Sequence, residues 1–224
     1  MALLLLLWML TVCAAEPQDL IGKVLIVPQH SPYSYLEVSP SNWKFDAVTL
    51  CMRIFLEPGR AHVMFSLATP AVPHDFLILK GPEDEVIQMY VRNEATSFRF
   101  LDIHPNRWNT YCATWDHISG LGQLWLNGNP SIRKYISSGS SISGPPSIIL
   151  GQKQDNYGFG FDPSQSFVGM MTDVHMWNYT ISHCEIKRYT EGQLFTPGNV
   201  LNWGALDFQT SGRVLIEEKQ TVCP

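Results

Sequence analysis

The sequence predicts an all-β protein with a sandwich or barrel architecture. Between residues 23 and 177, short stretches rich in Val, Ile, Leu and aromatic residues alternate with clusters of Gly, Pro, Asn and Ser, which is typical of such folds. The stretch 48–57 has a period of two that gathers its apolar residues on one face, namely Val48, Leu50, Met52, Ile54 and Leu56. The chain is 45% apolar and 16% charged, which describes a folded globular protein.

Further strands and one helix follow from local signals along the chain. We expect strands at residues 62–68, 76–80, 86–92, 97–103, 109–115 and 122–127, and strand-like sequence returns at 201–208 and 213–218. Asn127 followed by Gly128 predicts a tight turn. Ser182 and Glu185 form an S-x-x-E capping box, and Gly192 stands where a left-handed C-terminal residue belongs. These signals predict one short helix over residues 183–190.

The N-terminus is interpreted as a secretory signal peptide. Residues 2–12 form an uncharged apolar run, and Cys13, Ala14 and Ala15 supply the small residues that a cleavage site needs. The run is shorter than the ~20 residues that span a bilayer, so a membrane anchor is the weaker alternative. We therefore expect residues 1–15 to be removed and residues 16–224 to form one secreted, extracellular domain without a membrane span.

Charge and motif content exclude several classes of function. The chain carries 15 basic and 20 acidic residues, a net charge of −5, and has no Lys/Arg cluster, so nucleic acid is not an expected partner. Its seven histidines form no HExxH pattern of a zinc hydrolase. The acidic run 83–85 follows Gly81 and Pro82 and is interpreted as a solvated turn, not as a pair of glycosidase carboxylates. We expect a binding protein and not an enzyme.

Two kinds of extracellular modification are predicted. Four cysteines remain once the signal peptide has left, and their even number in an oxidising compartment favours disulfides, because no spacing fits a zinc site. Three pairings of these four are possible from the residues alone: they are Cys51, Cys112, Cys184 and Cys223. Asn178-Tyr179-Thr180 is a sequon, so Asn178 is expected to be glycosylated, with an unmodified helix approach as the alternative.

A longer pattern runs through the second half of the chain. Cys112, Thr114 and Trp115 fit the motif H-x-C-x-[ST]-W-x-[ST], although Thr110 and His117 depart from it. Other segments fall in a matching order and spacing, at residues 147–152, 154–155, 164–166, 168–169, 176–177 and 200–203. Together with the motif they resemble the pentraxin family, and the resemblance covers essentially the whole mature chain.

The pentraxin resemblance carries expectations about fold, assembly and partners. It implies a lectin-like, two-sheet antiparallel jelly roll with a long helix packed on one face, assembled into a cyclic homopentamer. It also implies calcium-dependent recognition of phosphocholine, phosphoethanolamine or related anionic groups on one face of the ring. Complement components and phagocyte receptors would engage the other face, as in innate immunity and the acute-phase response.

The same resemblance favours one of the three disulfide pairings. The separation of Cys51 and Cys112 is similar to that of the family's single intradomain disulfide, so these two are paired. Cys184 and Cys223 are then left as a second intrachain pair. An intersubunit bridge and two separate free thiols are the alternatives for these two residues.

The residues that bind two calcium ions in the family are only partly present in this sequence. By resemblance Gln154 offers a backbone carbonyl, Asp155 and Gln165 match side-chain ligands, and Asp162 stands in place of a Glu. Calcium needs 6–8 oxygen ligands, mostly carboxylates. Where the family has a Glu that bridges both ions, this chain has Lys153, which replaces a negative ligand by a positive group.

A second departure lies earlier in the chain. At the position of an Asp-Asn ligand pair stand Pro73 and His74, with Asp75 one residue later as a doubtful substitute. Our hypothesis is that Lys153 acts as an internal cation that pairs with Asp155 and Asp162 and holds the loop without metal. The alternatives are that Lys153 points to solvent while one weak ion binds through Asp155, Asp162 and Gln165, or that both ions are kept.

The ligand pocket that the resemblance implies is altered as well. Leu79 and Tyr90 fall at or near positions that cover the choline methyl groups, and a Tyr ring face can hold a cation. No acid aligns cleanly with the family's choline partner, since Ala95 stands near its place and Glu94 is adjacent. The alternative is that Leu79 and Tyr90 are ordinary sheet residues.

Two functions follow from these residues. The first is a secreted pentraxin-type pattern-recognition protein for phosphocholine-like or other anionic ligands, with calcium ligation weakened or lost. The second is a metal-independent, oligomeric adhesion or scaffold protein on the same fold.

Overall fold

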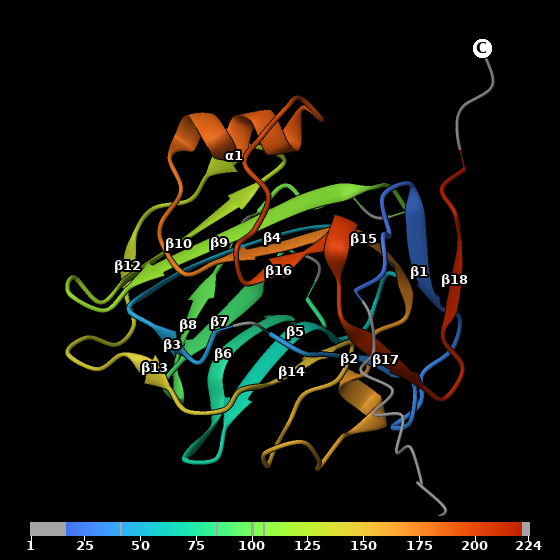
Figure 1. Cartoon of the computed structure of the whole chain (residues 1–224), viewed down its shortest axis with the longest axis horizontal. Helices are drawn as coiled ribbons and strands as arrows, with labels where there is room; N and C mark the ends of the chain where they lie inside the picture. Colours follow the sequence, from blue (N-terminus) through green and yellow to red (C-terminus); the bar gives the residue numbers. More distant parts are fainter. Residues whose placement is uncertain (1–16, 41, 84, 100, 105, 221–224) are drawn as a thin grey trace, which may run out of the picture.

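Two antiparallel sheets pack face to face in the computed structural model, which describes residues 17–220 except 41, 84, 100 and 105. All strand pairs within both sheets are antiparallel. This arrangement confirms the predicted all-β sandwich (Figure 1). The predicted signal peptide and Cys223 lie outside the described residues.

The larger sheet has nine strands, whose main order is β11-β10-β9-β4-β15-β1-β18, with β12 added to β10 and β16 to β15. Its strands are β1 (Lys23–Val27), β4 (Ala47–Leu56), β9 (Asn109–Asp116), β10 (Leu121–Leu126), β11 (Asn129–Pro130), β12 (Lys134–Tyr135), β15 (Gly169–Trp177), β16 (Leu201–Asn202) and β18 (Leu215–Glu218). The first and the last described strands are therefore neighbours at one edge.

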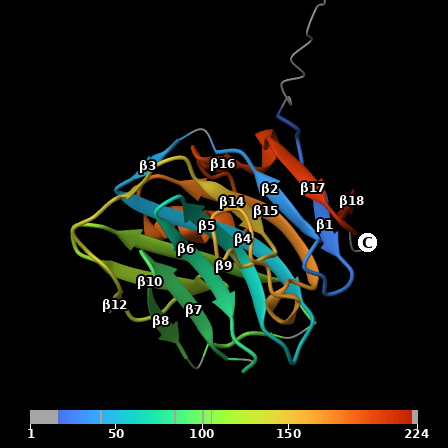
Figure 2. The same ribbon diagram turned by 90° about the horizontal axis from the view of Figure 1, so that it is seen from below.

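The smaller sheet has seven strands in the order β17-β2-β14-β5-β6-β7-β8, seen from below in Figure 2. They are β2 (Tyr35–Val38), β5 (His62–Thr69), β6 (Val72–Lys80), β7 (Ile87–Val91), β8 (Glu94–Phe98), β14 (Ser147–Leu150) and β17 (Phe208–Ser211). A separate short pair joins β3 (Lys44–Phe45) to β13 (Ile142–Ser143), and two short 3-10 turns, η1 and η2, cover Pro163–Gln165 and Trp203–Ala205.

The core lies between the sheets because the strands alternate as the sequence predicts. Leu50, Met52 and Ile54 of β4 are fully or almost fully buried in the main core, whereas Cys51 belongs to a second cluster on the outer face of the same strand. Burying apolar side chains between two sheets is the main stabilising contribution to a sandwich of this kind.

The outer face of the nine-stranded sheet is partly covered by one helix, α1 (His183–Thr190). Ser182 Oγ accepts a hydrogen bond from the Glu185 N–H at 3.2 Å, and Gly192 has φ 68° just after the helix, so the predicted bounds, the Ser182 cap and the role of Gly192 are confirmed. The Glu185 carboxylate accepts from the Thr196 N–H. With eight residues, α1 is not the long helix that the resemblance implies.

The disulfide lies beneath this helix. Cys51 and Cys112 stand directly opposite each other on β4 and β9, and their bond confirms the pairing drawn from the resemblance. They pack in the second cluster with Trp125 and Trp177 and with Ile186 of α1. The bridge therefore ties two central strands together under a covered surface.

Two predicted strand boundaries were wrong in ways that matter for the site. The strand expected at 97–103 is β8, Glu94–Phe98, because Arg92 and Asn93 take positive φ values of 54° and 66° and turn the chain back at once. The strand expected at 76–80 begins at Val72, which pairs with Thr69 across a two-residue turn. Pro73 and His74 therefore lie in a strand and not in a ligand loop.

Within the described residues, no helix has the length and apolar character needed to cross a membrane.

Candidate functional site

The predicted calcium and ligand residues gather on the outer face of the seven-stranded sheet, opposite α1. Figure 1 shows α1 above the nine-stranded sheet, while the β5–β6 hairpin and the loop between β14 and β15 reach the lower side. The site residues come from β6, β7 and this loop, which spans residues 151–168. Strands distant in sequence thus bring the candidate residues to one face.

An ion pair stands at the centre of this face. Lys153 Nζ lies 2.8 Å from Asp155 Oδ1, and the two side chains are 19% and 47% exposed. His74 Nε2 lies 3.5 Å from the same oxygen. Asp162, the other expected partner of Lys153, instead accepts hydrogen bonds from the backbone N–H and the hydroxyl of Ser164 at 2.9 and 2.7 Å. Those bonds cap η1 and lower the pKa of the Asp162 carboxyl.

The pKa of His74 lies below the ordinary value for histidine in this setting. Burial lowers the pKa of His74, and the positive charge of Lys153 lowers it further, while Asp155 opposes the shift. The buried Nε2 makes no hydrogen bond with the described residues, and its ring meets that of Tyr90 edge-on at 5.6 Å between centroids. A ligand or a water molecule could satisfy this nitrogen.

Asp75 has a different role from the one proposed for it. Its buried carboxylate accepts a hydrogen bond from Thr69 Oγ1 at 2.6 Å and from Arg92 Nη1 at 3.1 Å. Burial raises the pKa of Asp75, although these two bonds oppose the shift. Asp75 therefore fixes the β5–β6 and β7–β8 turns against each other, and its oxygens are already engaged.

Gln154 anchors the loop through its side chain, which sequence reasoning missed. The side chain is fully buried; Nε2 donates to the carbonyls of Ser66 and Ser147 at 3.0 and 3.1 Å, and Oε1 accepts from the Gly158 N–H at 2.9 Å. Gln165 Oε1, another predicted ligand atom, is buried and has no hydrogen-bond partner within the described chain.

An aromatic loop tip beside the ion pair was also missed. Tyr157 and Phe159 are 39% and 62% exposed, and Asn156 and Phe159 exchange two backbone hydrogen bonds of 3.0 and 3.1 Å that close a small hairpin. The local signal was present in the run of aromatic residues and glycines at 157–161. Because Gln154 holds this hairpin, the two rings are presented on an anchored turn.

The two predicted pocket residues lie on this same face. Leu79 packs in a small outer cluster with Val63 and Leu77, and Tyr90 packs against it. Leu79 is only 8% exposed, whereas Tyr90 is half-buried and donates its hydroxyl to Gln88 Oε1 at 3.2 Å. Leu79 is therefore almost covered by its neighbours, and Tyr90 is the more accessible of the two side chains for a ligand.

The donor set does not fit a pair of calcium ions. Pro73 supplies no side-chain oxygen, His74 supplies a nitrogen, and Lys153 places a positive charge against Asp155. Calcium is coordinated by oxygen, and Asp75 is already hydrogen-bonded elsewhere. Among the described residues, no three His, Cys, Asp or Glu side chains come together as a metal-ligating group.

The remaining predicted modification sites lie away from this face. Cys184 is exposed on α1 and forms no disulfide within the described part of the chain, so its pairing with Cys223 stays a prediction. The Asn178 side-chain oxygen accepts a hydrogen bond from Asn199 Nδ2 at 2.7 Å. That contact leaves the Asn178 amide nitrogen, the atom that carries a glycan, for the predicted glycosylation.

Comparisons with known proteins agree with this architecture. The family model described as Pentaxin family matches residues 23–218. The chain is 36% identical to female protein of Nothocricetulus migratorius, covering 90% of this chain and 86% of that protein. It is 34% identical to serum amyloid P-component of Mesocricetus auratus (90% and 85% covered) and 33% identical to C-reactive protein of Xenopus laevis (96% and 91% covered).

A solved structure shares the fold. The heptameric SAP-like pentraxin from Limulus polyphemus superposes with a TM-score of 0.80, at 20% identity, and covers 88% of this chain and 95% of its own. The family model and the relatives above 30% identity span most of the chain. This chain therefore belongs to the pentraxin family.

Proposed function

We propose that this chain is a secreted, homo-oligomeric recognition protein whose ligand face is organised by Lys153 in place of calcium. The observation that carries the proposal is the 2.8 Å ion pair between Lys153 and Asp155, two residues that the sequence resemblance assigns to the family's metal site. Homo-oligomerisation is supported by the membership of the chain in a family that includes the heptameric Limulus protein. Secretion is supported by the apolar N-terminal run.

Electrostatics opposes a calcium ion beside Lys153. Two unit charges about 4 Å apart near a protein surface interact by about 4 kcal/mol, so a divalent ion at that distance would be repelled by about 8 kcal/mol. The ammonium group also occupies the Asp155 oxygen that the ion would need. Lys153 thus supplies locally the positive charge that calcium supplies in relatives with the complete ligand set.

The chemistry of the face favours a zwitterionic ligand such as phosphocholine or phosphoethanolamine. Lys153 can contact the phosphate, although Asp155 partly neutralises it, and the half-buried Tyr90 ring can hold the ammonium end. Lys80, at the end of β6, does not supply the positive charge for the phosphate, because it is buried and donates to the Gly81 carbonyl at 3.0 Å. We propose that complement components bind the opposite face, which bears α1, as the family resemblance implies.

A metal-independent adhesion or scaffold role is the second candidate. The exposed Tyr157 and Phe159 rings favour it, since aromatic side chains on a fixed turn make contacts that need no ion. In this case the protein would bind a protein surface through the loop tip, and phosphocholine would not compete.

Retention on phosphoethanolamine resin separates these functions. We expect the secreted protein to be retained equally in calcium and in chelator, and to be eluted by free phosphocholine. Retention that requires calcium would contradict the role of Lys153, and no retention in either buffer would favour the adhesion role.

A variant that restores the family's ligands tests where the site lies. Pro73→Asp, His74→Asn and Lys153→Glu together should raise calcium affinity at least about tenfold, because three oxygen ligands return and a repulsive charge leaves. Lys187→Glu, on the exposed surface of α1, makes the same charge change as Lys153→Glu and should leave calcium affinity unchanged. If the triple variant gains nothing over this control in calorimetry, the inferred site is wrongly placed.

A further inference from the structure

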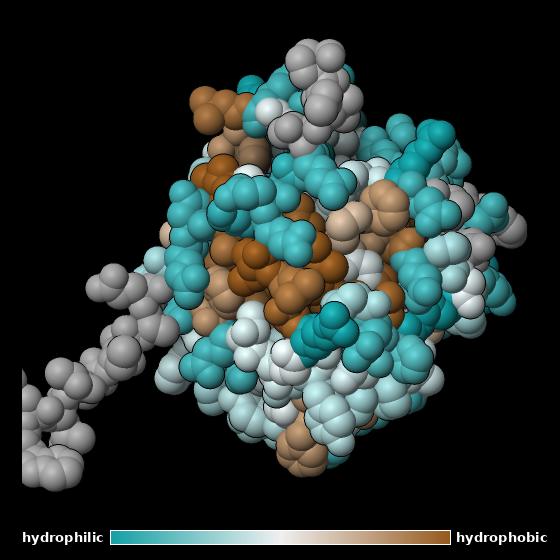
Figure 3. All heavy atoms as spheres, turned by 90° about the vertical axis from the view of Figure 1, so that its right-hand side faces the viewer, coloured by the Kyte–Doolittle hydropathy of each residue, from teal (hydrophilic) through white to brown (hydrophobic). Residues whose placement is uncertain are grey.

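A cavity of about 430 Å³ lies on the outer face of the nine-stranded sheet, beside the start of α1. It lies at the β10–β12 edge of the sheet, opposite the β1–β18 edge, where Figure 3 shows apolar side chains gathered at the centre of the surface. A volume of this size is typical of a small-molecule site. The lining includes Thr114, Asp116, Gln123, Arg133, Ile181 and His183, and we call this hollow the β10 cavity.

The strand register positions the floor of the β10 cavity. Trp115 of β9 points into the main core, so its neighbour Thr114 points to the outer face. Thr114 stands opposite Gln123 of β10 in the ladder. Gln123 in turn holds Arg133, whose Nε donates to Gln123 Oε1 at 3.2 Å. The side chains of Thr114, Gln123 and Arg133 therefore follow one another across the floor.

The segment that leads into α1 forms the facing wall. Thr49 of β4 is the other neighbour of Thr114 in the sheet. The Thr49 hydroxyl donates to the Tyr179 carbonyl at 2.8 Å and accepts from the Ile181 N–H at 3.1 Å. These two bonds fix the segment over β4, on the side of the cavity away from Arg133. Because α1 begins two residues after Ile181, the positive end of its dipole lies beside the cavity.

Three polar groups at the β10 cavity have unused hydrogen-bonding capacity. Thr114 is only 5% exposed, yet its hydroxyl makes no hydrogen bond with the described residues. The two Nη atoms of Arg133 likewise have no partner in the described part of the chain. Asp116 Oδ1 accepts from the N–H groups of Ile118 and Ser119 and from the Ser119 hydroxyl, whereas no described donor reaches Oδ2. Because buried polar groups are normally hydrogen-bonded, the Thr114 hydroxyl points to a ligand in the cavity.

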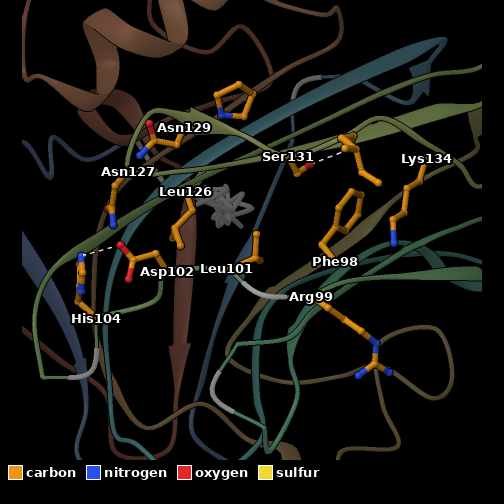
Figure 4. A pocket seen from close by; sticks show the side chains of 12 residues that line it. Phe98, Arg99, Leu101, Asp102, His104, Leu126, Asn127, Asn129, Ser131 and Lys134 are labelled. Carbon is orange, nitrogen blue, oxygen red and sulfur yellow. Dashed lines mark hydrogen bonds and ion pairs between the residues drawn. The ribbon is translucent and has the colours of Figure 1, made fainter.

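A second cavity, of about 570 Å³, lies at the same edge but between the two sheets, and it differs in character. Figure 4 shows Leu101, Leu126 and Phe98 around it. Asp102 and His104 at its rim lie 3.6 Å apart and engage each other. The unused polar groups therefore make the β10 cavity the better candidate for a polar ligand.

We propose that the β10 cavity binds a small hydroxylated carboxylic acid of the sugar-acid class. The ligand carboxylate pairs with the two free Nη atoms of Arg133, whose spacing matches its two oxygens, and the nearby start of α1 favours the negative charge. Ligand hydroxyls accept from Thr114 Oγ1 and donate to Asp116 Oδ2, and Ile181 contacts the C–H groups. Hydrogen bonds from Ser119 lower the pKa of Asp116, so this acceptor is ionised at neutral pH.

Calorimetric titration in chelator with three small probes tests the ligand class. Glucuronate carries both the carboxylate and the hydroxyls, glucose lacks the carboxylate, and alanine has an ammonium group in place of the hydroxyls. We expect a dissociation constant on the order of 1 mM for glucuronate, and binding at least about tenfold weaker for the other two. No glucuronate binding up to about ten times that concentration, or glucose or alanine binding as tightly as glucuronate, would overturn the proposal.

Two variants test the position of the site. Thr114→Val removes one hydroxyl at nearly constant volume and Arg133→Gln removes the guanidinium, and each should weaken glucuronate binding at least about fivefold. Arg133 is exposed, so circular dichroism should show the fold of its variant unchanged. Arg99→Gln is the matched control, at an exposed arginine that pairs with Glu83 outside the β10 cavity, and it should bind glucuronate as the unaltered protein does.

Selectivity separates the roles of the two residues. In Arg133→Gln the preference for glucuronate over glucose should disappear, whereas Thr114→Val should weaken the binding of both. The site lies on the face opposite Lys153 and needs neither calcium nor the ligand of the proposed function, so Lys153→Glu should leave glucuronate binding unchanged. Unaltered affinity in both cavity variants, or loss of glucuronate binding in Lys153→Glu, would place the probe elsewhere and overturn the proposal.

Discussion

His62 lies fully buried between the two sheets and is held in one neutral tautomer. Its Nδ1 accepts from the Val168 N–H at 3.2 Å, so Nε2 carries the proton and donates to the Glu57 carbonyl at 2.7 Å. Burial lowers the pKa of His62 from 6.5 to about 4. Burial lowers the pKa of His175 to about 4 as well, beside the rings of Trp177 and Phe195.

These buried histidines predict the direction of the stability change with pH. Between pH 6.5 and 4 the unfolded chain binds more protons than the folded one, so the stabilisation is complete above pH 6.5 and is lost as pH falls toward 4. A pKa difference of this size corresponds to a contribution of roughly 3 kcal/mol by His62 to the pH dependence of the unfolding free energy. We expect urea unfolding at fixed protein concentration to show a large loss of stability from pH 7 to pH 4.5.

A variant assigns part of that loss to His62. His62→Gln should be less stable at pH 7 and should show a smaller change between the two pH values, because the group that must take up a proton is gone. His30→Gln, at an exposed loop residue, is the control and should keep the full dependence. An unchanged pH dependence in His62→Gln would show that His62 does not contribute to it.

At the scale of elements, we expect the disulfide to make a measurable contribution to the free energy of unfolding. Cys51 and Cys112 are 61 residues apart and join neighbouring strands under α1. Closing a loop of that length contributes about 4 kcal/mol in the chain-entropy model. We expect the double variant Cys51→Ala, Cys112→Ala to lose up to about this amount of unfolding free energy in urea titration. A loss below about 1 kcal/mol would mean that the bridge does not constrain the unfolded chain.

The elements differ in how far the sequence predicts them. The bounds of α1 follow from Ser182 and Gly192 because helix ends are set by local contacts. The start of β8 was missed because Arg92 and Asn93 form a left-handed turn without a glycine, which local sequence signals only weakly. β15 was not among the predicted strands, and its alternation is interrupted where the register shifts between Thr172 and His175.

The site shows the same division between local and distant contacts. The family resemblance was enough to propose the Lys153–Asp155 pair, since both residues lie in one loop. The engagement of Asp75 by Arg92 depends on a neighbouring strand, and the anchoring of Gln154 depends on Ser66, which lies 88 residues away. Such contacts are set by strand order, which periodicity does not reveal.

The whole molecule combines a face that α1 partly covers with an open ligand face on the opposite side. α1 lies over part of the outer face of the nine-stranded sheet, and the seven-stranded sheet carries the Lys153–Asp155 pair on its outer side. In the proposed homo-oligomer several ligand faces would act together. Weak binding at each chain would then add up to strong binding of a surface with many copies of the ligand.

Calcium titration of the whole protein is the most direct test of the central claim, that Lys153 replaces the metal. The chelator-stripped protein would be titrated with calcium by calorimetry, and separate samples would be titrated with phosphocholine, one in chelator and one in calcium. We predict no calcium heat up to low-millimolar concentration, and phosphocholine binding that does not depend on calcium. Calcium binding at micromolar concentration, followed by phosphocholine binding only in its presence, would contradict this account.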